Sequence, residues 1–70
     1  MQEFKLENAD FIELNSLLKV MGLCGTGGMA NTAITEGLVK VDGKVELRKR
    51  CKVRAGQLVE FRDRKIIVSL

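Results

Sequence analysis

Positive charge is concentrated in one short stretch, residues 48–54, which reads Arg-Lys-Arg-Cys-Lys-Val-Arg and is called the basic segment below. If the segment is extended, side chains two residues apart lie on one side at intervals of about 6.6 Å. Successive phosphates of a nucleic-acid strand are separated by a similar distance, roughly 6–7 Å. Arginine is favoured where a phosphate accepts two hydrogen bonds. The segment therefore predicts contacts to a phosphate backbone, which carry no base information, from Arg48, Arg50, Lys52 and Arg54.

The remaining charge is divided unevenly along the 70 residues, whose formal net charge is +3. Residues 1–39 hold two Lys against five acidic residues, a net charge of −3. Residues 40–70 hold ten Lys or Arg against four acidic residues, a net charge of +6. A one-sided basic end predicts a polyanionic partner, either nucleic acid or an acidic membrane surface. The alternative is that the charges form a solvated face that keeps a small protein soluble.

The residues that are missing argue against an enzyme, a metal site and a cofactor. The sequence has no His, so the usual general base and the commonest metal ligand are absent. Cys24 and Cys51 lack the paired spacing of a zinc site and are expected to be free, buried or half-buried thiols in a reducing compartment. The neighbouring cations Arg50 and Lys52 could lower the thiol pKa of Cys51. Three Phe and no Trp or Tyr leave little for an aromatic stacking platform.

Two helices are expected to precede the basic segment, after a short strand over Gln2–Leu6. Asp10 and Glu13 form a capping-box pattern for the first helix, which ends at Gly22. Its apolar stripe comprises Phe11, Leu14, Leu17, Leu18 and Met21. The second helix runs from about Gly27 to Glu36, with Thr26 as its N-cap and Gly37 as its exit. Its inward side chains are expected to be Met29, Ala30, Ala33 and Ile34, which makes the two helices one αα unit.

The Gly25-Thr26-Gly27-Gly28 turn between these helices has two interpretations. It is either a tight turn with a Thr cap or a helix N-terminus whose free N–H groups hold a phosphate. It is not a nucleotide-binding loop, because no Gly-Lys-Ser/Thr follows it.

From Leu38 onward the apolar period changes to two, which predicts strands. Asp42-Gly43 marks a hairpin, for which a three-residue loop with Gly43 at positive φ keeps the apolar residues on one face. That loop pairs Val39 with Val45 and places Lys40 opposite Lys44, an arrangement that an anion between them would stabilise. A turn at Ala55-Gly56, a strand over residues 57–61, a turn over residues 62–65 and a last strand over residues 66–70 follow.

Three stretches resemble the RNA-binding domain of small-subunit ribosomal protein four, the S-four domain. They are Thr-Gly-Gly-Met-Ala at 26–30, Ile-Thr-Glu-Gly-Leu-Val-Lys-Val-Asp-Gly-Lys at 34–44 and Val-Arg-Ala-Gly-Gln at 53–57. The resemblance covers about residues 11–61, and the Arg-Lys-Arg-Cys-Lys run looks most like the small stand-alone bacterial members of the YbcJ type. Gly27 and Asn31 stand where many members carry cations, so the basic hairpin and its extension would supply most of the charge.

The resemblance implies an α+β fold in one domain over residues 1–70. Two packed helices precede a small, mainly antiparallel sheet of about four to five short strands, the S-four-like (αL-type) RNA-binding fold. It implies a protein that binds structured RNA, with ribosomal RNA as one candidate. The stretch Met1-Gln2-Glu3-Phe4-Lys5 has no signal-peptide pattern, so a cytoplasmic protein is expected. We further expect a non-catalytic monomer without a cofactor or a membrane. The expected RNA-binding residues are Thr26, Gly27, Asn31, Lys40, Lys44, Arg48, Lys49, Arg50, Lys52 and Arg54.

Three other functions stay open. The basic surface would also suit a protein-interaction adaptor that docks an acidic partner. A β-grasp sulfur carrier needs a Gly-Gly C-terminus, whereas this sequence ends Val68-Ser69-Leu70. An RNA-modifying enzyme would need a catalytic domain attached to this one. A steep loss of binding with salt would favour RNA over an apolar adaptor surface.

Overall fold

The computed structural model describes residues 1–70. Its elements are β1 (Gln2–Lys5), β2 (Ile12–Glu13), α1 (Leu14–Val20), α2 (Gly27–Thr35), β3 (Val39–Val41), β4 (Lys44–Val45), β5 (Lys52–Val53), β6 (Leu58–Phe61) and β7 (Arg64–Ser69). Five strands form one sheet in the order β1-β7-β6-β3-β4, in which only the β1–β7 pair is parallel. Strands β2 and β5 form a separate antiparallel pair. The predicted α+β fold with a mainly antiparallel sheet is confirmed.

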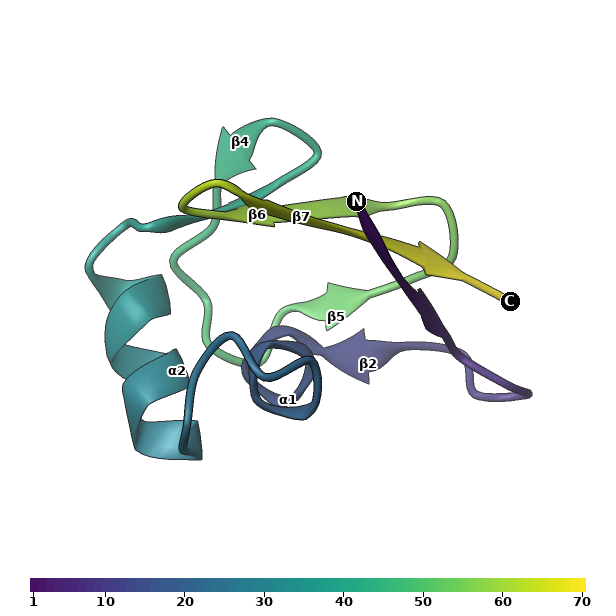
Figure 1. Cartoon of the computed structure of the whole chain (residues 1–70), viewed down its shortest axis with the longest axis horizontal. Helices are drawn as coiled ribbons and strands as arrows, with labels where there is room; N and C mark the ends of the chain where they lie inside the picture. The colour runs from purple at the N-terminus through teal and green to yellow at the C-terminus, as the bar shows by residue number, and fades with distance from the viewer.

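The molecule has two layers, with the five-stranded sheet in one and both helices and the β2–β5 pair in the other (Figure 1). All buried side chains are apolar, and they meet between the layers. From the sheet come Val39, Val59 and Ile66, and from the helices come Leu17 and Ile34, each with no exposed surface. The opposite face of the sheet is left to solvent. Neither helix is long and apolar enough to span a membrane.

Helix α1 begins at Leu14, so the predicted start at a capping box of Asp10 and Glu13 is wrong. Glu13 is the N-cap residue, but its side chain makes no capping hydrogen bond. Residues 12 and 13 instead pair with Val53 and Lys52 of β5. Phe11 therefore lies before the helix rather than on its apolar stripe. Pairing with a strand some forty residues later decides where the helix begins.

Helix α2 starts and ends as local signals predict. Thr26 is the N-cap, and its Oγ1 accepts a hydrogen bond from the backbone N–H of Met29 at 3.1 Å. Gly22 and Gly37 follow the last residues of the two helices with φ of +75° and +80°, the left-handed conformation that ends a helix. Met29 is 58% exposed, so its predicted place in the core is wrong.

The hairpin between β3 and β4 has a two-residue turn, so the predicted three-residue loop is wrong. Asp42 (φ 53°) and Gly43 (φ 83°) both have positive φ, as a type I′ turn requires. Val41 lies opposite Lys44, and Lys40 lies opposite Val45. The predicted like-charge pair of Lys40 and Lys44 therefore does not form. The prediction of positive φ at Gly43 is confirmed.

Strands β6 and β7 lie close to their predicted positions, whereas the segment between β4 and β5 departs from the predicted alternation. Strand β6 begins one residue later than expected, and β7 begins at Arg64 because the turn before it is shorter. Val45 and Leu47 are 52% and 57% exposed, so the alternation of buried side chains stops after the hairpin. Beyond β4 the chain leaves the sheet and crosses to the helical layer (Figure 1).

Candidate nucleic-acid interface

The basic segment is bent rather than extended, so the predicted straight row of cations is wrong. Lys49 and Arg50 form a turn, in which the N–H of Cys51 donates to the carbonyl of Arg48 at 3.2 Å. Only Lys52 and Val53 are in a strand. The bent segment surrounds a hollow of about 400 Å³ that is lined by Arg48, Arg50, Cys51 and Lys52. Three cations and no carboxylate line this hollow, which suits an anionic ligand better than a flat row does.

The first turn of α1 anchors the basic segment. The backbone N–H groups of Leu14 and Asn15 donate to the carbonyls of Cys51 and Lys49 at 2.9 and 3.1 Å. The first N–H groups of a helix have no partner within the helix, so these carbonyls act as its cap. These two hydrogen bonds fix the backbone of the basic segment, while its Lys and Arg side chains remain exposed.

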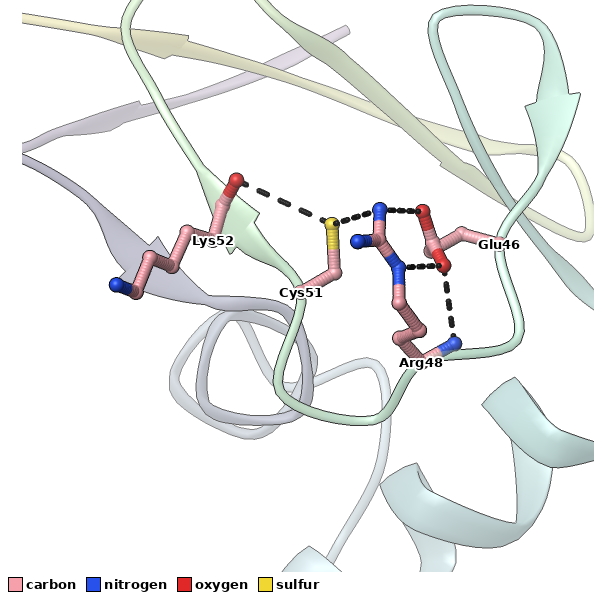
Figure 2. Close-up of polar contacts among 4 residues, drawn as sticks. All are labelled: Glu46, Arg48, Cys51 and Lys52. Atoms are coloured by element: carbon pink, nitrogen blue, oxygen red, sulfur yellow. Dashed lines mark hydrogen bonds and ion pairs between the residues drawn. The ribbon is translucent and has the colours of Figure 1, made fainter.

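Glu46 fixes the side chain of Arg48 (Figure 2). Its Oε2 accepts hydrogen bonds from Nε and from the backbone N–H of Arg48 at 2.9 and 3.0 Å, and its Oε1 accepts one from Nη2 at 3.0 Å. These bonds lower the pKa of Glu46 to about 2 and raise the pKa of Arg48. The carboxylate side chain is 17% exposed and the guanidinium side chain is 77% exposed. The pair therefore presents its positive partner to solvent.

Cys51 lies beside this ion pair, with its Sγ 3.8 Å from Nη2 of Arg48 (Figure 2). Partial burial raises its thiol pKa, and the carboxylate of Glu46 adds to the increase. The expected lowering by Arg50 and Lys52 is therefore wrong, because desolvation and Glu46 outweigh nearby positive charge. Both cysteines are free, as predicted, with Cys24 buried and Cys51 half-buried.

Two cations at the end of the basic segment share one aromatic ring. Strand pairing places Phe11 next to β5, and Nζ of Lys52 and Cζ of Arg54 lie 5.0 and 5.6 Å from the centre of its ring. A cation over an aromatic face is attracted by the electrons of the ring. Phe11 thus holds both side chains on one side of β5. The sequence assigned Phe11 to a helix, so this role was missed.

Of the expected residues on α2, Asn31 is linked to the basic segment through Asn15. The Nδ2 of Asn15 donates to Oδ1 of Asn31 at 2.9 Å, while the backbone of Asn15 donates to Lys49. Thr26 uses its hydroxyl oxygen to cap α2, and Gly27 is the first residue of that helix. Thr26 lines a different groove, of about 660 Å³, together with residues such as Met29, Phe61 and Arg62. The structural interpretation of the Thr cap is confirmed.

Lys40 and Lys44 lie on opposite faces of the hairpin. Residues directly opposite each other in antiparallel strands share a face. Lys40 therefore shares the solvent face of the sheet with Val45 and Glu60, whereas Lys44 shares the face of buried Val41. The structure brings together Arg48, Lys49, Arg50, Lys52 and Arg54 and leaves Lys40 on the side of the sheet away from the helices.

The sequence of the chain matches a known family along nearly its whole length. The family model described as the S4 domain matches residues 4–69. The chain belongs to the S4 family. This membership confirms the resemblance to the S-four domain. The matched residues include both helices and every strand, apart from the first two residues of β1.

Relatives within the S4 family are similar in sequence and in structure. The chain is 52% identical over 61 residues to the "Putative RNA-binding protein YbcJ" of Escherichia coli (strain K12), and the match covers 87% of each chain. The "Uncharacterized protein YbcJ" of Shigella flexneri matches to the same extent. The solution structure of YbcJ from E. coli, described as revealing an alfaL motif involved in RNA-binding, aligns with a TM-score of 0.78 and 47% identity. That alignment covers all of this chain and 89% of the other. YbcJ of E. coli thus resembles this chain in both sequence and fold.

Proposed function

We propose that this S4-family protein binds structured RNA, without catalysis, through phosphate contacts made by the basic segment. The observation that carries the proposal is the hollow lined by three cationic residues, Arg48, Arg50 and Lys52, with no acidic residue in its lining. A polyphosphate chain gains from several close cations because each contact releases a counterion from it. The RNA-binding description given to YbcJ of E. coli supports the same class of ligand.

The site is held ready before any ligand arrives. Backbone hydrogen bonds from α1 hold Lys49 and Cys51, Glu46 holds Arg48, and the ring of Phe11 holds Lys52. Side chains that are already ordered lose less freedom when a ligand binds. A folded RNA presents phosphates in a fixed arrangement, so we expect it to bind this bent set of cations better than an unstructured strand does.

The test compares two triple variants that change charge equally. The first variant removes the cations of the hollow by combining Arg48→Glu, Arg50→Glu and Lys52→Glu. The control replaces Arg62, Arg64 and Lys65 near the β6–β7 turn with Glu, which likewise lowers the formal net charge from +3 to −3. Fluorescence anisotropy with a labelled RNA hairpin is expected to show a loss of more than about tenfold for the first variant only.

Three further measurements complete the test. Thermal melts show whether each variant folds, and the triple Ala variant of the hollow replaces the Glu variant if the latter does not. Oligouridine of equal length tests the preference for structure, and poly-glutamate as a competitor tests docking of an acidic protein instead. Equal weakening by both triple variants, or competition by poly-glutamate as strong as that by RNA, would contradict the proposed site.

The cellular ligand and the assembly state belong to the same proposal. We take ribosomal RNA as the first candidate and the monomer as the binding form. Crosslinking in the native cell followed by sequencing of the bound RNA identifies the ligand. Light scattering of the protein with and without the hairpin measures the number of copies in each complex.

A further inference from the structure

We infer that Glu46, an acidic residue inside a basic surface, is a positioning residue for RNA binding because it aims the guanidinium of Arg48 at a phosphate. The inference rests on the proposed function, since it concerns how the same site takes up its ligand. Glu46 precedes the basic segment in the sequence, and the charge pattern alone gives it no part in binding.

The geometry of the pair leaves the outer part of the guanidinium free. Arg has five side-chain N–H donors. Glu46 accepts from Nε and from Nη2, while both donors of Nη1 are without a partner (Figure 2). The remaining contact of Nη2 is to Cys51 Sγ at 3.8 Å, a weak acceptor that a phosphate oxygen can displace. The edge formed by Nη1 and Nη2 can therefore offer two parallel hydrogen bonds to one phosphate.

Glu46 is itself held in place, so it can act as a fixed support. Its backbone N–H donates to the carbonyl of Val39 at 3.0 Å, which ties it to strand β3 of the sheet. Its carboxylate also accepts from the backbone N–H of Arg48, which fixes the base of the side chain as well as its end. Because the carboxylate is 17% exposed and the guanidinium 77%, an arriving phosphate meets Arg48 first.

Positioning and simple electrostatics predict opposite results when the carboxylate is removed. If Arg48 acts only as a mobile charge, loss of a negative charge from the surface strengthens binding of a polyanion. If Glu46 orders Arg48, its loss weakens binding because the side chain must then be ordered by the ligand, a cost of about 3- to 10-fold in affinity. The sign of the change therefore separates the two roles.

The experiment uses Glu46→Gln, which keeps the size of the side chain but cannot accept both guanidinium donors. Asp63→Asn is the matched control, because Asp63 is an exposed turn residue that makes no side-chain hydrogen bond and loses the same charge. We expect Glu46→Gln to weaken binding of the RNA hairpin about 3- to 10-fold and Asp63→Asn to leave it equal or slightly tighter. In NMR spectra, the Nε–H signal of Arg48 should lose its protection from exchange only in Glu46→Gln.

A second pair of variants tests whether Glu46 acts through Arg48. Arg48→Lys keeps the charge but has no planar fork, so it should lose about as much affinity as Glu46→Gln. Adding Glu46→Gln to Arg48→Lys should then cause no further loss. Arg48→Lys also carries the test if Glu46→Gln does not fold.

The outcomes separate this inference from the proposed function. Unchanged or tighter binding by Glu46→Gln in a folded protein, or parental affinity in Arg48→Lys, overturns the positioning role while RNA binding stands. If the parent protein binds no RNA, the proposed function fails and the inference fails with it. Loss of Nε–H protection with no loss of affinity also overturns the role in binding.

Discussion

The salt dependence of RNA binding follows from the number of cations that the structure gathers. The basic segment presents five exposed cationic side chains, Arg48, Lys49, Arg50, Lys52 and Arg54. If four or five of them contact phosphates, the slope of log affinity against log salt is about −3 to −4. Raising the salt from about 50 to 200 mM should then weaken binding roughly 60- to 250-fold.

Removing one contact at a time tests the same reasoning more sharply. Arg50→Ala should make the slope shallower by about 0.7 to 0.9, the contribution of a single phosphate contact. Lys40→Ala is the matched control, since Lys40 is a cation of similar exposure on the opposite face of the sheet. We expect it to leave the slope unchanged.

The assay is fluorescence anisotropy of a labelled RNA hairpin at four or more salt concentrations, with thermal melts of each variant as a check on folding. A parental slope shallower than about −1 would refute the multiple phosphate contacts. An equal change of slope in Lys40→Ala and Arg50→Ala would refute the division of the surface into a binding and a non-binding face.

Three other predictions concern stability and reactivity. Gly43→Val should destabilise the fold by about 1 kcal/mol or more in thermal melts, because a β-branched residue is forced to positive φ, and a parental melting temperature would contradict this. The carboxylate of Asp42 accepts hydrogen bonds from the backbone N–H of Leu58 and from the side-chain amide of Gln57. The bond from Leu58 has the larger effect, and together they lower the pKa of Asp42 below 3.8. The stabilisation is complete above pH 3.8 and is lost as the pH falls through the lowered pKa, so Asp42→Asn should flatten the acid decline of the melting temperature. The raised pKa of Cys51 predicts slower alkylation by iodoacetamide at pH 8 than in an unfolded cysteine peptide; faster alkylation would contradict it.

Local rules predicted the features that depend on neighbouring residues alone. The hydroxyl of Thr26 caps α2 three residues away, and the glycines after both helices supply the positive φ that ends them. These interactions close within a few residues, so the sequence shows both partners together. The basic character of residues 48–54 was equally visible, because charge does not depend on the path of the chain.

Features that depend on distant partners were not predictable in this way. The start of α1 is set by carbonyls of Lys49 and Cys51, more than thirty residues later, which replace the expected capping box. The aromatic support of Lys52 and Arg54 likewise requires Phe11 to lie beside β5. No spacing in the sequence announces either contact. The Glu-x-Arg spacing of Glu46 and Arg48 was visible, but a separation of two residues does not by itself predict an ion pair.

The hairpin shows which of two competing rules prevails when an edge strand is short. Keeping apolar residues on one face favoured a three-residue loop, whereas Asp-Gly favours a type I′ turn. Strand β4 contains only Lys44 and Val45, both exposed, so little apolar burial depends on its register. Asp42 is also fixed by its two oxygens, which bind Leu58 and Gln57. Turn chemistry therefore decides the pairing here.

The parallel pairing of β1 with β7 has a consequence for how the nascent chain matures. Strand β1 lies at the edge of the sheet and has β7 as its one neighbour, with Gln2–Lys5 in register with residues 66–69. During synthesis, β1 has no hydrogen-bonding partner until residues 66–69 have also been made. Phe4 and Leu6 stay uncovered for the same interval. The sheet can therefore close only after residues 66–69 have been synthesised, so β1 completes the sheet after every other strand of the domain has been made.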